Sequence, residues 1–145
     1  MTSTTYFPDV NLWIALASDQ HVHNAAARIW LDGINDDRIA FCRITELGLL
    51  RLLANAHVMG DDVLSPAAAW RVYDVFRADP RITFVGEQAG FDAYWQERAS
   101  HVAGGGNRWT DAYLAAFAAH WDFTLVTFDR SIMAHRDCAV VTLSL

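Results

Sequence analysis

The segment that most constrains this chain is residues 4–17, TTYFPDVNLWIALA, which joins an expected strand to an expected helix through an acidic residue. Residues 5–7 favour extended backbone, and Pro8 removes one donor from a hydrogen-bonding ladder. Apolar residues recur at helical spacing from Asn11, a plausible N-cap. Asp9 therefore stands at a strand tip, where open α/β sheets bind their ligands, although an acid at this position can also merely cap the helix.

The same alternation of strand and helix continues along the chain. Further strands are expected at residues 39–42, 82–85, 124–128 and 139–143. Helices are expected at residues 25–31, 47–54, 67–78, 89–102 and 109–120, with a loop over residues 55–65 that can include a short turn. This order predicts an α/β fold with a central, mostly parallel, twisted sheet of about five strands flanked by helices. We expect a single domain spanning residues 1–145.

Composition narrows the class of protein. No apolar run approaches the roughly 20 residues of a membrane span, and no basic region precedes an apolar core at the N-terminus, so we expect a cytoplasmic protein. The two cysteines, Cys42 and Cys138, lack the spacing of zinc ligands and are expected to be reduced. A net charge of −6 argues, by itself, against non-specific binding to nucleic acid.

Four carboxylates occupy the ends of expected elements. Asp9 ends the first strand, Glu46 opens the helix after the second, Asp111 follows the glycine run at 104–106, and Asp129 ends the fourth strand. In a parallel sheet with right-handed crossovers, these positions converge on one edge. Taken singly, an acid in a first helical turn needs no explanation beyond ~0.3–1 kcal/mol of helix stabilisation. Together the four acids predict a site.

Such a cluster needs a cation. Two carboxylates about 5 Å apart repel by roughly 3 kcal/mol at an effective dielectric constant of 20, and the fold cannot sustain several such pairs. Carboxylate oxygens without thiolate or histidine partners suit Mg²⁺ or Mn²⁺ better than zinc. A bound ion of this kind can activate water and stabilise charge on a phosphate, which predicts phosphodiester hydrolysis.

The segments that carry these acids resemble the motifs of the PIN-domain nucleases, in particular the VapC toxins of VapBC toxin-antitoxin modules. The matching segments, in order, are PDVNLWIAL, RITELGLLRLL, NRWTDAYLAAFA and LVTFDR. The resemblance implies a PIN-like fold and a Mg²⁺- or Mn²⁺-dependent endoribonuclease that cleaves RNA. It also implies a homodimer held inactive by a VapB-type antitoxin.

The resemblance also assigns roles to residues of this chain. The matches to the family's metal-binding and catalytic acids are Asp9, Glu46, Asp111 and Asp129. The matches to its supporting polar positions are Asn11, Thr45 and Thr127. Some members carry a further acid one turn after the third motif, where this chain has Leu114 and Ala115, so the number of metal ions stays open.

Arginines offset the acidic balance near these motifs. Four of them flank the motifs, namely Arg43, Arg51, Arg108 and Arg130. All four can contact phosphates, and we select Arg43, Arg108 and Arg130 as substrate-binding residues; the alternative for each is surface solubility or ion pairing.

The helix at residues 47–54 has two apolar faces, more than one core needs. We predict that this helix, with Trp13 and Trp30, helps to form the antitoxin groove, and that Leu49 and Leu52 contribute to antitoxin binding.

Three alternative functions differ in the residues that they require. A phosphatase with Asp9 as nucleophile would need an acid at position 11 and a lysine, whereas Asn11 is present and lysine is absent. A non-catalytic α/β protein-binding module would use the acids only as helix caps. A PIN-type nuclease acting on DNA would carry the same motifs.

Overall fold

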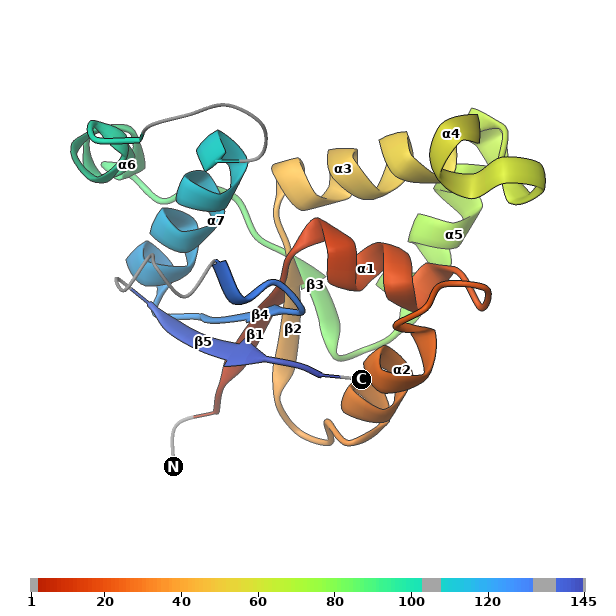
Figure 1. Cartoon of the computed structure of the whole chain (residues 1–145). Coiled ribbons are helices and arrows are strands. Elements are labelled where there is room, and N and C mark those ends of the chain that lie inside the picture. The colour runs from red at the N-terminus through yellow and green to blue at the C-terminus, as the bar shows by residue number, and fades with distance from the viewer. Residues whose placement is uncertain (1–2, 103–107, 132–137, 145) are drawn as a thin grey trace.

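The fold is an α/β sandwich, seen in a computed structural model that describes residues 3–102, 108–131 and 138–144 (Figure 1). The strands are β1 (Thr5–Pro8), β2 (Arg38–Phe41), β3 (Ile82–Phe84), β4 (Thr124–Thr127) and β5 (Ala139–Thr142). The helices are α1 (Val10–Ala17), α2 (Asn24–Asp32), α3 (Arg43–Leu53), α4 (Ala56–Met59), η1 (Gly60–Asp62), α5 (Pro66–Ala78), α6 (Phe91–Ala99) and α7 (Arg108–Trp121). The glycine run at 104–106 lies outside the described residues. No described helix is long and apolar enough to cross a membrane.

The sheet has five strands in the order β3-β2-β1-β4-β5, and every neighbouring pair is parallel. The predicted α/β architecture is therefore confirmed. Because all strands run in the same direction, their carboxyl ends meet at one edge of the sheet. At that edge β1 continues into α1 and β2 into α3, while β1 lies between β2 and β4 (Figure 1).

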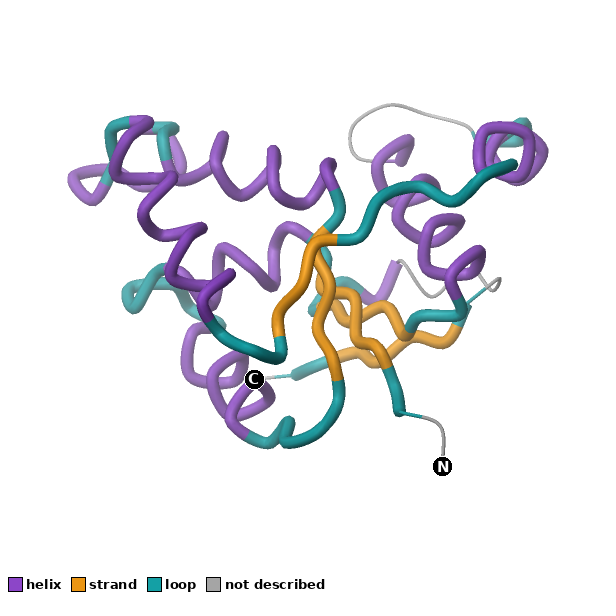
Figure 2. The backbone as a smooth tube through the Cα atoms, turned by 180° about the vertical axis from the view of Figure 1, so that it is seen from behind, coloured by secondary structure: helices purple, strands orange, loops and turns teal. Residues whose placement is uncertain are grey.

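Helices cover both faces of the sheet. On one face α1, α2, α3 and α5 pack over the strands, and on the other face lie α6 and α7 (Figures 1 and 2). Each face of the sheet carries its own cluster of buried apolar side chains. Along β2 the side chains alternate between them: Ile39 and Phe41 belong to the larger cluster, under α1, α2, α3 and α5, whereas Ala40 belongs to the cluster under α6 and α7. Successive side chains of a strand point to opposite faces of the sheet, and here both faces are buried. The strands are therefore short, mainly apolar segments of the sequence.

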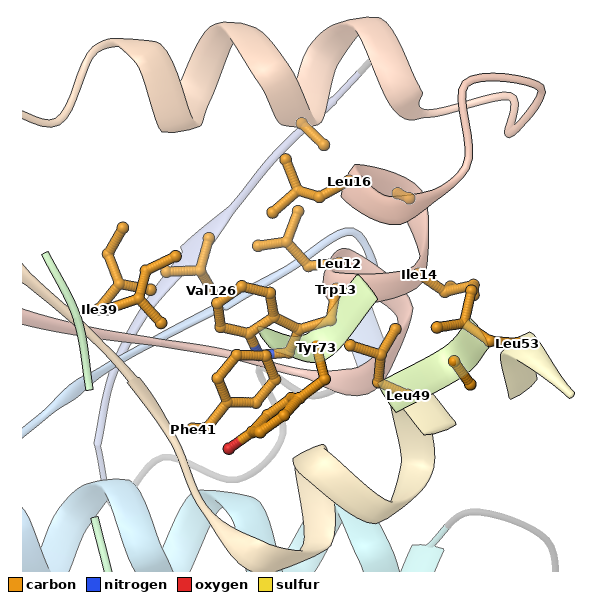
Figure 3. Close-up of a cluster of buried hydrophobic side chains, with 14 of the residues drawn as sticks. Leu12, Trp13, Ile14, Leu16, Ile39, Phe41, Leu49, Leu53, Tyr73 and Val126 are labelled. Carbon is orange, nitrogen blue, oxygen red and sulfur yellow. The ribbon is translucent and has the colours of Figure 1, made fainter. Parts of the chain in front are cut away.

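Trp13 lies at the centre of the larger cluster (Figure 3). Its ring stacks on Phe41 with 3.7 Å between centroids and 12° between planes. Leu49 of α3 is buried beside them. The prediction that Trp13 and Leu49 line an antitoxin groove is therefore wrong, because both side chains fill the core.

The leucines of α3 are divided between its inner and outer faces differently from the prediction, because Leu49 lies on the inner face. Leu53 shares the core face with Leu49, while Leu47 is 57% exposed and Leu50 and Leu52 are half-buried. Helical periodicity establishes that two apolar faces exist, but which one meets the core depends on how the helix packs.

The predicted loop at residues 55–65 contains short turns. It contains the single turn α4 and the 3-10 turn η1, and the side chain of Asn55 caps α4 by accepting from the His57 amide at 2.9 Å. Turns this short have no apolar repeat by which the sequence could reveal them.

Candidate active site

Asp9 connects β1 to α1. Its amide donates to the Val126 carbonyl at 3.0 Å, which extends the pairing of β1 with β4 by one residue. Its Oδ1 atom accepts from the Leu12 amide at 2.9 Å, so Asp9 is the N-cap of α1. The sequence prediction that Asn11 caps this helix is wrong: Asn11 is already the second helical residue, and its side chain is exposed. An aspartate caps as well as an asparagine does, so residue preference could not decide between them.

Thr127, the last residue of β4, holds the other oxygen of Asp9. The Thr127 Oγ1 hydroxyl donates to Asp9 Oδ2 at 2.5 Å and accepts from the Asp129 amide at 2.9 Å. Thr127 and Asp9 are both buried. One hydroxyl therefore fixes the carboxylate after β1 relative to the turn that carries Asp129.

The electrostatics of Asp9 reveal its acidic neighbours. Burial raises the pKa of Asp9 from 3.8 to about 6, and hydrogen bonds from Thr127 and the Leu12 amide oppose this rise. The negative charges of Asp111 and Asp129 raise the pKa further. The structure thus brings three of the four predicted acids into electrostatic contact, at a position where water cannot screen them fully.

A cavity of about 150 Å³ opens between α1, α3 and α7 beside these acids. Its lining includes Asp9, Asn11, Arg51 and Asp111. Asp129 is exposed, and its Oδ1 atom accepts from the Ser131 amide at 2.9 Å and from the Ser131 hydroxyl at 2.7 Å. Its carboxylate is thereby oriented without being buried.

Glu46, the fourth predicted acid, contacts Arg43 and Tyr73 in the described structure. It is buried in the first turn of α3, where its Oε1 atom pairs with Arg43 Nη1 at 2.6 Å. It also lies beside Tyr73, where burial and Glu46 both raise the pKa of the tyrosine. Among the described residues, the acids that raise the pKa of Asp9 are Asp111 and Asp129, and Glu46 is not one of them.

Thr45, predicted as a supporting residue, shapes the start of α3. Its Oγ1 atom accepts from the Cys42 amide at 3.0 Å and donates to the Cys42 carbonyl at 3.1 Å. It therefore orients the helix from which Glu46 projects, and the described structure gives it no contact with the aspartates.

The donor chemistry of the three aspartates fits a hard divalent cation. All their ligand atoms are carboxylate oxygens, and Asp9 carries a desolvated charge that two neighbouring acids repel. Within residues 3–102, 108–131 and 138–144, however, no group of three or more His, Cys, Asp or Glu side chains already stands in metal-binding geometry. Occupancy would therefore require these side chains to turn toward a common centre.

The arginines that flank the motifs differ in their contacts and in their exposure to solvent. Arg43 pairs with Glu46 and lies 4.5 Å from the Phe84 ring centroid, while Arg108 and Arg130 are exposed. Arg51, which we did not select as a substrate contact, lines the aspartate cavity. The signal in the sequence is that Arg51 lies within RITELGLLRLL, the same segment that carries Glu46.

Comparison with known proteins assigns the family. A family model for the PIN domain matches residues 6–137. This chain belongs to the PIN-domain family. Ribonuclease VapC41 of Mycobacterium tuberculosis (strain ATCC 25618 / H37Rv) is 44% identical over 126 residues, which cover 83% of this PIN-domain chain and 86% of the relative. Ribonuclease VapC29 of the same strain is 34% identical over 140 residues, covering 94% and 96%.

Solved structures share the fold at lower sequence identity. VapBC2 from Rickettsia felis, bound to a DNA fragment from its promoter, superposes on this PIN domain with a TM-score of 0.74 and 16% identity, covering 97% of this chain and 100% of the other. VapC20 of Mycobacterium tuberculosis, a sarcin-ricin-loop-cleaving toxin, gives a TM-score of 0.68 and 15% identity, covering 89% and 93%. The predicted PIN-like fold is confirmed.

Proposed function

We propose that this PIN-domain protein is a metal-dependent endoribonuclease, the toxin of a type II toxin-antitoxin system, which hydrolyses phosphodiester bonds in RNA. The observation that carries the proposal is the buried carboxylate of Asp9, fixed at both oxygens and repelled by Asp111 and Asp129. Relatives 44% and 34% identical are named ribonucleases, which favours RNA over DNA as the substrate.

In this proposal Asp9, Asp111 and Asp129 hold Mg²⁺ or Mn²⁺. When bound, the ion supplies an activated water and stabilises charge on the phosphate. The protein's own task is orientation: the Leu12 amide and the Thr127 hydroxyl hold the Asp9 carboxylate in place, so that little reorganisation accompanies binding. Glu46 is the fourth member of the predicted catalytic set. To join the three aspartates, its carboxylate would have to leave Arg43 and turn toward the cavity.

The proposal includes two protein partners, a second copy of the chain and a VapB-type antitoxin, in the cytoplasm. VapBC assemblies among the structural neighbours support the antitoxin. Apolar side chains exposed outside the core, including Leu47 of α3 and Trp70 of α5, support burial against a partner.

The first test is cleavage of total RNA by the purified protein with Mg²⁺, with Mn²⁺ and with EDTA. We expect discrete fragments only when metal is present, because the carboxylates alone repel the phosphate. The double variant Asp9→Asn/Asp129→Asn should lose at least about 100-fold in rate, since charge-stabilising groups contribute on that scale.

The matched control is Asp74→Asn, which removes an exposed acid from α5, far along the chain from the site. It should cleave like the unmodified protein, whereas a contaminating nuclease would be equally active in all preparations. Metal-independent cleavage would contradict the metal requirement, and equal cleavage of single-stranded DNA would extend the substrate class. A folded, antitoxin-free protein that cleaves neither would contradict the proposal.

A further inference from the structure

We propose that Arg51 binds a phosphate of the RNA strand at the aspartate cavity and positions that strand for cleavage. This inference rests on the proposed function and names a residue that acts on the same substrate. Arg51 lines the cavity together with Asp9, Asn11 and Asp111, although it lies far from each of them in the sequence. The role of Arg51 follows from three features: the charge of the cavity, the finding that Arg51 joins no ion pair among the described residues, and its place on α3.

The charge of the cavity calls for a cation from the protein. Asp9 and Asp111 line the cavity, and Asp129 is close enough to raise the pKa of Asp9. Each carboxylate repels a phosphodiester, and the whole chain carries a net charge of −6. Among the described residues that line this cavity, Arg51 is the one basic side chain.

Arg51 is not engaged elsewhere in the described structure. The two ion pairs found among the described residues are Arg43–Glu46 and Arg81–Asp79. Arg81 also donates to the carbonyls of Leu31 and Ile34, so its guanidinium is engaged within the fold. Arg51 is exposed, joins neither pair, and is not among the groups that shift the pKa of Asp9. Its donors therefore remain available to a ligand.

The backbone fixes where Arg51 can reach. Arg51 follows Gly48 by one turn of α3, and a Cβ atom at Gly48 would lie 2.6 Å from Val10 Cγ2. The two helices therefore approach closely at Val10, the residue after Asp9, which places Arg51 in the lining of the same cavity as Asp9. A guanidinium presents paired donors that match two phosphate oxygens, a geometry that lysine cannot reproduce.

The test compares Arg51→Met and Arg51→Lys with Arg71→Met. Arg71 is an exposed arginine of α5 outside the cavity and outside both ion pairs, so it controls for the general loss of one positive charge. We expect Arg51→Met to lower kcat/KM for RNA cleavage about ten- to a hundredfold, the scale of one charge-assisted hydrogen bond. Arg51→Lys should fall between, and Arg71→Met should stay within about twofold.

Salt dependence distinguishes a phosphate contact from a structural role. Loss of one phosphate contact should make the slope of log kcat/KM against log salt shallower by about 0.7 to 0.9 for Arg51→Met. A slope and a rate equal to those of Arg71→Met would overturn the proposal. Thermal unfolding of the variants, measured alongside, should match that of the unmodified protein, and marked destabilisation by both Arg51 variants would instead assign Arg51 a structural role.

A binding arm separates this inference from the proposed function. A fluorescein-labelled RNA hairpin is titrated with the Asp9→Asn protein, with and without Arg51→Met, and its anisotropy is recorded. We expect about tenfold weaker binding without Arg51. Arg51-dependent binding by a chain that never cleaves RNA would contradict the ribonuclease proposal while supporting this one. Equal binding by both proteins would overturn the inference, even if the unmodified protein cleaves RNA.

Discussion

Asp9 combines two roles that the sequence presents as alternatives. Its Oδ1 atom caps α1 and its Oδ2 atom accepts from Thr127, so capping fixes the orientation of the same carboxylate that faces Asp111 and Asp129. Burial beside other acids is unfavourable for the ionised form. The site therefore stores repulsion that a bound cation can relieve, and the isolated protein should be less stable for it.

The repulsion at Asp9 predicts that Asp9→Asn changes the free energy of unfolding in a pH-dependent way when no divalent metal is present. The folded protein holds the Asp9 proton with a pKa of about 6, above the ordinary value of 3.8, so folding favours the neutral acid. The stability that this provides is present below pH 3.8 and is lost as the pH rises toward 6. Above pH 6 the gap corresponds to about 3 kcal/mol, by which Asp9→Asn should stabilise the fold.

Urea unfolding of both proteins in EDTA, from pH 4 to pH 8, measures this difference. The advantage of Asp9→Asn should shrink toward zero at the acid end of the series. Asp74→Asn, at an exposed position, should show no such trend. A variant that is less stable at pH 8 would mean that the hydrogen bonds of the carboxylate outweigh its burial.

The approach of α1 to α3 positions the site at the level of elements. Gly48 permits the approach, because a Cβ atom there would lie 2.6 Å from Val10 Cγ2 and 3.0 Å from Val10 Cγ1. Leu49, the residue after Gly48, enters the core cluster that contains Trp13. The rotation of α3 is thus held by a close contact and by packing, and this rotation points Arg51 at the cavity.

We therefore expect Gly48→Ala to lower both stability and activity. Overpacking costs about 1–3 kcal/mol, and the better helix propensity of alanine offsets about 1 kcal/mol of it. Because Val10 follows Asp9, its displacement should also reduce kcat/KM. Urea unfolding and RNA cleavage measure the two effects.

The control is Gly33→Ala, whose Cβ atom would meet only ordinary contacts of 3.5 Å. It should leave stability and activity nearly unchanged. The double variant Val10→Ala/Gly48→Ala should recover the stability that Gly48→Ala loses if the contact is responsible. No recovery would place the cause elsewhere in α3.

At the scale of the whole molecule, strand order brings the acids together. β1 lies between β2 and β4, so the turn after β4 and the turn after β1 are neighbours, and Thr127 can bridge them. α7, packed on the other face of the sheet, contributes Asp111 to the same edge. A metal bound here would connect α1, β4 and α7, and its binding energy would stabilise the entire fold.

Mn²⁺ should therefore raise the melting temperature of the unmodified protein. At a free metal concentration 100 times the Kd, linkage adds about 2.7 kcal/mol, which corresponds to several degrees for a chain of this size. EDTA should reverse the shift. The Asp9→Asn/Asp129→Asn protein should show no shift, and an equal shift in both proteins would place the metal outside the proposed site.

Features of the fold and the site that depend on neighbouring residues along the chain could be predicted from the sequence. Alternating β-favouring and helical segments predicted a parallel α/β sheet, and acids at the ends of elements predicted the edge where Asp9, Asp111 and Asp129 meet. These features are local, because a strand end or a first helical turn is written in consecutive residues. Parallel topology then brings separate ends together without any detail of packing.

The tertiary structure alone decided which side chains reach the cavity. Glu46 pairs with Arg43, and Arg51 lines the aspartate cavity, because α3 has one particular rotation against α1. That rotation is set by Leu49 in the core and by the close contact of Gly48 with Val10. Such contacts join residues distant in the sequence, and helical periodicity is equally consistent with either face turned inward. Only the packed molecule distinguishes the two.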